Sequence, residues 1–120
     1  MAERHGYHLG TLGGLQVTHL TAINNNGQVA DWGTTSTGAT DGFLDSNGTV
    51  TDLGSFTPFA LNDNGVMVDG DLIDSGGSVQ NLNNLIPAKS GYTISLAFAI
   101  NDNGQIAATT GGAGVLLTPN

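Results

Sequence analysis

The stretch AINNNGQVAD at residues 22–31 decides the fold, because the chain repeats it as ALNDNGVMVD at residues 60–69 and as AINDNGQIAA at residues 99–108. In each copy an apolar pair runs into Asn-Asn-Gly or Asp-Asn-Gly and then into alternating apolar positions. Asn-Gly is a strong hairpin signal because a type I′ turn needs a positive φ at both central residues. Apolar residues at period two are typical of strands. Each copy is therefore predicted to be a strand–turn–strand hairpin.

A second type of hairpin alternates with the first. GFLDSNGTVTDLG at residues 42–54 and DLIDSGGSVQNLN at residues 71–83 each place an apolar-Asp pair before a turn and a Val-x-x-Leu pattern after it. A third copy is expected near the end of the chain, where only its first strand is found, in GVLLTPN at residues 114–120.

The missing strand of that last hairpin has a counterpart at the N-terminus. GYHLGTLGG at residues 6–14 matches the pattern, with Leu9 standing where Leu53 and Leu82 stand. We therefore expect residues 115–117 to pair with residues 7–9, in the same molecule or in a neighbouring one.

The turn glycines Gly27, Gly65 and Gly104 recur after 38 and 39 residues, which predicts three copies of a four-stranded unit. We expect one all-β domain over residues 1–120, with no helix. The units resemble propeller blades, so that two chains would dimerise into a six-bladed ring. A monomeric β-trefoil or β-prism is the alternative. The expected units are residues 7–48, 49–77 and 78–120, with the N-terminal strand completing the last unit.

The charge balance excludes several partners. Only Arg4 and Lys89 are basic, and the net charge is −8, so almost nothing could neutralise nucleic-acid phosphates or bind an anionic membrane surface. No apolar run approaches the length of a membrane span, so membrane insertion is not expected. The absence of cysteine excludes disulfides and thiolate chemistry.

Several motifs together resemble the HAF family of probable extracellular repeat proteins. They are LGTLGG at residues 9–14, DLGS at residues 52–55, the AIN-x-NGQ hairpin, and NLNNLIPAKSGYTISLAFAINDNGQIAA at residues 81–108 followed by GVLLTP. The last stretch is similar to the C-terminal repeats of PEP-CTERM-type secreted proteins. The resemblance covers most of the chain and implies a propeller-like repeat and an extracellular or cell-surface location. It supplies no catalytic or binding residues.

The third unit departs from that family pattern. It has AATTGGAGV at residues 107–115, where the family often has a Gly-x-x followed by His-Ala-Phe-Leu. We therefore expect its third strand to be shortened. MAERHGYHLG at residues 1–10 lacks the apolar core of a signal peptide, so secretion is implied by the resemblance alone.

Metal ligation is not predicted. His5, His8 and His19 are the only histidines, and a zinc or copper site usually needs more converging ligands than these. DSNGTVTD at residues 45–52 carries oxygen ligands at alternate positions but lacks the dense carboxylates and final Glu of an EF-hand loop. Calcium at this turn is kept as a minor alternative to ordinary turn chemistry.

Three other aspartates, Asp69, Asp71 and Asp74, cluster in VDGDLID at residues 68–74. A cation there is a second minor alternative to the solvated ends of strands.

A hydrolase site is the alternative functional hypothesis. GTTSTG at residues 33–38 does not match the G-x-S-x-G nucleophile elbow, but Ser36 with His19 and Asp31 would supply a nucleophile, a base and an acid. The cleft that such a set needs would lie between units.

The leading hypothesis is a non-catalytic binding or structural module with a carbohydrate or cell-surface ligand. Trp32 beside Asp31 is the combination that holds sugars by stacking and hydrogen bonding, and Asp69 and Asp71 complete the candidate ligand set. A Trp32 packed between units is the simpler reading. Phe59 and Phe98 take equivalent positions before their hairpins and are predicted to lie in the core.

Overall fold

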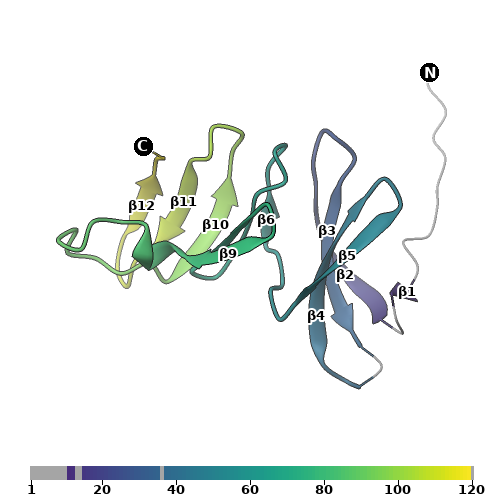
Figure 1. Cartoon of the computed structure of the whole chain (residues 1–120). Coiled ribbons are helices and arrows are strands. Elements are labelled where there is room, and N and C mark those ends of the chain that lie inside the picture. The colour runs from purple at the N-terminus through teal and green to yellow at the C-terminus, as the bar shows by residue number, and fades with distance from the viewer. Residues whose placement is uncertain (1–10, 13–14, 36, 120) are drawn as a thin grey trace.

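The computed structural model describes residues 11–12, 15–35 and 37–119 (Figure 1), and side chains from residue 22 onward. The described chain is all-β, as predicted. The expected strand at residues 7–9 lies outside the described residues, and so do His5, His8 and Ser36.

Strands that follow one another in the chain pair with one another in three antiparallel sheets. The first sheet consists of β1 (Thr11–Leu12), β2 (Leu15–Ile23), β3 (Val29–Thr34), β4 (Thr40–Ser46) and β5 (Thr49–Gly54). The second consists of β6 (Ala60–Leu61), β7 (Met67–Asp69), β8 (Leu72–Ser75) and β9 (Ser78–Asn81). The third consists of β10 (Leu96–Ile100), β11 (Ile106–Thr109) and β12 (Gly114–Leu117).

The only helical segment in the described part of the chain is the short 3-10 turn Leu82–Asn84. Within that same part, no helix has the length and apolar character needed to cross a membrane.

All three copies of the opening motif form the predicted hairpins, β2–β3, β6–β7 and β10–β11. The second type of hairpin is also confirmed, as β4–β5 and β8–β9. In β4–β5, Ser46 pairs with Thr49 across a two-residue turn in which Asn47 and Gly48 both have positive φ. That turn is of the type that an Asn-Gly sequence predicts.

The three repeated turns differ from the type I′ turn expected for them. In the first, only Gly27 has a positive φ, and its N–H donates to the carbonyl of Asn24. The reason is the Asn24 side chain, whose Oδ1 accepts from the N–H groups of Asn26 and Gln28. Such Asx bonding holds the intervening residues in an ordinary turn and leaves the left-handed conformation to the glycine.

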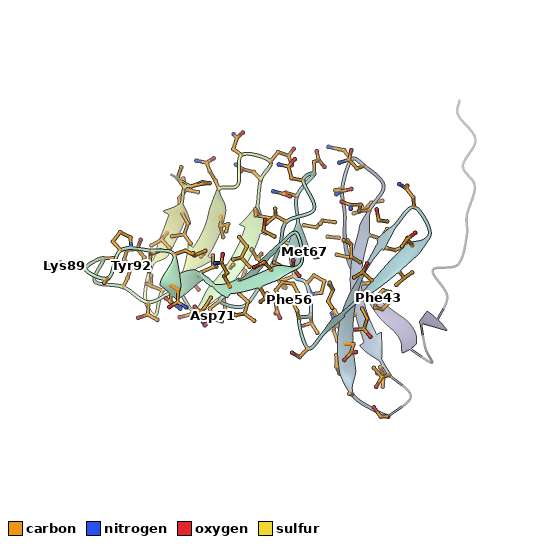
Figure 2. The ribbon with its side chains drawn as sticks, viewed as in Figure 1. Phe43, Phe56, Met67, Asp71, Lys89 and Tyr92 are labelled. Atoms are coloured by element: carbon orange, nitrogen blue, oxygen red, sulfur yellow. The ribbon has the colours of Figure 1, made fainter. Side chains whose placement is uncertain are left out.

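Apolar side chains pack between the first and second sheets. Ala30 of β3, Met67 of β7 and Phe56 of the connecting segment are buried together, and Figure 2 shows Phe56 and Met67 at this junction. Leu44 and Leu61 pack at the edge of the cluster. Residues of the motif therefore hold the two sheets together.

A larger core joins the second and third sheets. Val68 of β7 packs with Ala97, Ile106 and Ala108 of the third sheet. Leu82, which follows β9, is buried in the same core. Met67 and Val68 are adjacent in one strand and point to opposite faces. The second sheet is therefore covered on both faces, whereas the first and third sheets form the two ends of the row.

The prediction that Phe59 and Phe98 lie in the core is wrong. They are 53% and 46% exposed, and their rings meet edge to face with centroids 6.1 Å apart. Position in the repeat makes the two residues equivalent, but the sheets pack through other positions, so the rings cover each other at the surface.

Candidate functional site

The turns of the three repeated hairpins lie side by side along one edge of the molecule (Figure 1). We call this row the turn column and define it as residues 24–28, 62–66 and 101–105. The side-chain amide of Asn24 donates to the carbonyl of Asn62 at 3.0 Å, and that of Asn62 donates to the carbonyl of Asn101 at 3.0 Å. One asparagine per repeat therefore links each turn to the next.

A second line of bonds runs beside the first. The backbone N–H of Asn25 donates to Asp63 at 2.7 Å, and that of Asp63 donates to Asp102 at 2.8 Å. The amides of Asn26 and Asn64 reach the carbonyls of Asp63 and Asp102. Each of the three Asn or Asp positions in the first and second turns thus has a hydrogen-bond partner in the turn that follows.

The negative charge of Asp63 also stabilises the turn column. Hydrogen bonds from the backbone and then from the side chain of Asn25 hold the pKa of Asp63 below its usual range. The carboxylate of Asp63 is the form that accepts these bonds, so the column is complete when Asp63 is ionised.

Asp31 is fully buried in β3, and neither of its carboxyl oxygens has a hydrogen-bond partner among the described residues. Burial, with a smaller contribution from Asp45, raises the pKa of Asp31 to about 7. The group therefore holds a proton in mildly acidic solution, because its environment disfavours the charge. A buried carboxyl of this kind does not reach a ligand in solvent.

Trp32 and Asp69 are related in different ways to the segment that connects the first two sheets. Trp32 is half-buried and pairs with Gly42 across β3–β4. A Cβ at Gly42 would overlap the carbonyl oxygen of Phe56. Asp69 accepts from the N–H of Thr57 at 3.0 Å. Asp69 is therefore bonded to the connecting segment, and Trp32 lies beside Gly42, the residue of β4 against which this segment packs.

Asp71 follows at the turn between β7 and β8, where it accepts from the amide of Asn81 at 3.2 Å. We define the connector site as Trp32, Thr57, Asp69 and Asp71. These residues comprise an aromatic ring and oxygen acceptors, which are the groups that hold a polyhydroxylated ligand where they converge. Asp31 is not part of it.

The hydrolase set of Ser36, His19 and Asp31 lies mostly outside the described side chains. The backbone of His19 lies opposite Trp32 in the β2–β3 pair, and Ser36 is outside the described residues. Among the described side chains, no group of three or more histidines and acidic residues comes together as a metal site. Asp69 and Asp74 are held by Thr57 and by the N–H of Gly77, respectively.

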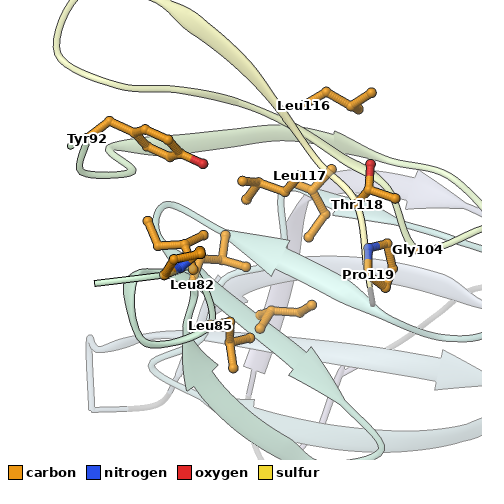
Figure 3. Close-up of a pocket in the computed structure, with 12 residues that line it drawn as sticks. Leu82, Leu85, Tyr92, Gly104, Leu116, Leu117, Thr118 and Pro119 are labelled. Atoms are coloured by element: carbon orange, nitrogen blue, oxygen red, sulfur yellow. The ribbon is translucent and has the colours of Figure 1, made fainter. Parts of the chain in front are cut away.

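Sequence reasoning missed an apolar groove of about 280 Å³ between the second and third sheets (Figure 3). Residues 82–95, which connect β9 to β10, supply one side of it through Leu85 and Tyr92, and Leu116 and Pro119 supply the other. The signal was present in the apolar residues of that long insertion. The groove is mostly aliphatic, so it offers few of the hydrogen bonds that hold a sugar.

No protein-family model, curated protein or solved structure matches this chain.

Proposed function

We propose that the protein is an extracellular, non-catalytic repeat module, a rigid scaffold that presents a glycan-binding surface. The turn column is the observation that carries the proposal. The residues that the sequence repeats most faithfully, the Asn and Asp residues of the turns, bond one repeat to the next. Their conservation within the chain has a structural cause and needs no catalytic one.

The binding part of the proposal rests on the connector site. Trp32 is half-buried, which leaves part of the indole to stack on a sugar ring. Asp69 and Asp71 are half-buried near the same end of β7. Their positions are fixed by the bonds to Thr57 and Asn81, so the acceptors are held in place before a ligand arrives.

Two further features support an extracellular location. Only 10% of the residues are charged, against roughly 25% in an ordinary soluble domain, and such surfaces are common in secreted β proteins. The resemblance to HAF repeats implies the same location.

The test is to incubate the protein with a panel of soluble oligosaccharides and to record both retention on the protein and the mass of the recovered sugars. We expect retention of intact sugars, weakened by Trp32→Ala and by Asp69→Asn. Tyr92→Ala is the matched control, since it removes an exposed aromatic ring outside the connector site. Shortened sugars would establish the hydrolase instead, and an absence of retention would reject the glycan ligand.

A further inference from the structure

We infer that the chain associates head to tail with a second copy of itself, through the two ends of its row of sheets. The inference concerns assembly and does not depend on glycan binding. It begins with the direction of the turn column. The first turn donates to the second, and the second donates to the third, so the column has a donor end and an acceptor end.

The donor end is the third turn. Among the described residues, the amide of Asn101 bonds within its own turn, to Gln105, whereas the equivalent amides of Asn24 and Asn62 reach the next turn. The N–H of Asp102 stands where Asn25 and Asp63 donate to a neighbouring carboxylate. Among the described residues, no fourth turn receives these donors.

The acceptor end is the first turn. The carbonyl of Asn24 is equivalent to those of Asn62 and Asn101, each of which accepts an amide from the preceding turn. The side-chain oxygen of Asn25 stands where Asp63 and Asp102 accept an N–H. The two ends are therefore chemically complementary.

The apolar contacts, like the hydrogen bonds of the turn column, run from each sheet to the next sheet in the chain. Val68 and its cross-strand partner Ile73 face the third sheet and pack in the core there. The equivalent pair on the third sheet is Ala107 and Leu116. Ala107 is exposed, and Leu116, which also lines the rim of the apolar groove, is 64% exposed. The third sheet thus presents the surface that the second sheet uses to bind its successor.

The first sheet presents the other half of that contact near its turn. Leu61 and Ile100 take equivalent positions before their turns, and each packs in the core shared with the preceding sheet. Their counterpart on the first sheet is Ile23, which is 71% exposed. Ile23 lies at the turn end of a face whose middle, at Phe43 and Asp45, is already buried. Ile23 of one copy is therefore the matching contact for the third sheet of another, and the two copies meet at the turn end of the first sheet.

These observations select a second copy as the occupant. Both ends repeat contacts that this chain already makes between its own units, so the surface that fits each end is the opposite end of the same chain. A head-to-tail contact forms a closed ring when its rotation closes. Two copies of a three-unit chain would form a six-unit ring, within the size range of propellers.

The first measurement is the mass in solution by light scattering coupled to size exclusion. We expect twice the 12.2 kDa of one chain. Ile23→Glu and Leu116→Glu should each return the particle to the mass of one chain. Val79→Glu, at a residue 48% exposed on β9, should leave the pair intact. A wild-type mass of one chain at every accessible concentration would overturn the inference, and so would a growing series of masses.

Cross-linking tests the direction and does not depend on the charged variants being folded. The chain has no cysteine, so Asn25→Cys and Asp102→Cys can be made as two single-cysteine proteins and treated with a short bis-maleimide. The mixture should give a covalent dimer, and each protein alone should give little. Equal cross-linking by each protein alone, or none in the mixture, would contradict head-to-tail contact.

Discussion

The side-chain amide of Asn62 donates to the main-chain carbonyl of Asn101 across 3.0 Å, which joins two turns that are 39 residues apart in the chain. Asn62 is buried, and its Oδ1 also accepts from the N–H groups of Asn64 and Val66 inside its own turn. One side chain therefore shapes a hairpin and links it to the next.

Replacement of Asn62 should be costly for this reason. Asn62→Ala removes three hydrogen bonds at a buried position, and we expect the free energy of unfolding to fall by about 2–4 kcal/mol. Urea denaturation measures the loss. Asn101→Ala is the matched control, with both variants made in the Leu116→Glu background so that no second copy meets the third turn. The Oδ1 of Asn101 accepts the same two N–H bonds within its turn, but Asn101 is exposed and bonds to no further turn among the described residues, so we expect about 1 kcal/mol there. Equal losses would show that the link between turns adds nothing.

Gly42 should be intolerant of a side chain. A Cβ there would overlap the carbonyl oxygen of Phe56 and lie 2.6 Å from Cδ of Pro58, so β4 or the connecting segment would have to move. We expect Gly42→Ala to cost about 3 kcal/mol or more. The control is Gly114→Ala in β12, where a Cβ meets open space, and thermal unfolding should change little. A harmless Gly42→Ala would refute the close packing described for this segment.

Asp31 should make the protein less stable as the pH rises from about 4 to about 7. Its pKa is raised from 3.8 to about 7 in the folded state, so in this range the folded protein holds a proton that the unfolded chain has lost. The loss of stability should approach about 4 kcal/mol and level off above pH 7. The lowered pKa of Asp63 acts at lower pH, where its stabilisation is lost as the pH falls below about 4.

Denaturant unfolding of Asp31→Asn at several pH values checks this prediction. The variant should lose most of the decline between pH 4 and pH 7. Asp71→Asn, which keeps an oxygen to accept from Asn81, should retain the decline. A wild-type protein whose stability is constant over this range would contradict the burial of an unpaired carboxyl at Asp31.

The edge-to-face pair of Phe59 and Phe98 should couple the second and third sheets. A double-mutant cycle with Phe59→Ala, Phe98→Ala and the double variant should give a coupling energy of about 0.5–1 kcal/mol. The half-exposed position places the expected value in the lower part of the usual range. Additive effects of the two substitutions would mean that the rings contribute independently.

The hairpins could be predicted from the sequence because their signals are local. Asn-Gly and Gly-Gly turns between alternating apolar residues correctly predicted five hairpins of the described chain. The type of the repeated turns could not be predicted from Asn-Gly alone, since the side chain of Asn24 fixes it through bonds to residues on either side of the turn tip.

The burial and the partners of side chains between the sheets could not be predicted from such local signals. Asp31 and Asp69 occupy the same place in the motif, yet Asp31 is fully buried with no hydrogen-bond partner in the described part of the chain, whereas Asp69 is half-buried and bonded to Thr57. The prediction that Phe59 and Phe98 lie in the core was wrong for the same reason. Repetition shows which residues are equivalent, but the neighbours of each copy decide whether a side chain is covered.

The sheet order has a consequence for how the protein is made. Every described strand pairs with the strand next to it in the chain, so each sheet is built from local contacts. Local contacts close short loops and form quickly, whereas the bonds of the turn column span 37 to 39 residues and must wait for two finished hairpins. A nascent chain can therefore complete its sheets one after another during synthesis. The asparagines of the turn column then form hydrogen bonds between the turns of successive sheets.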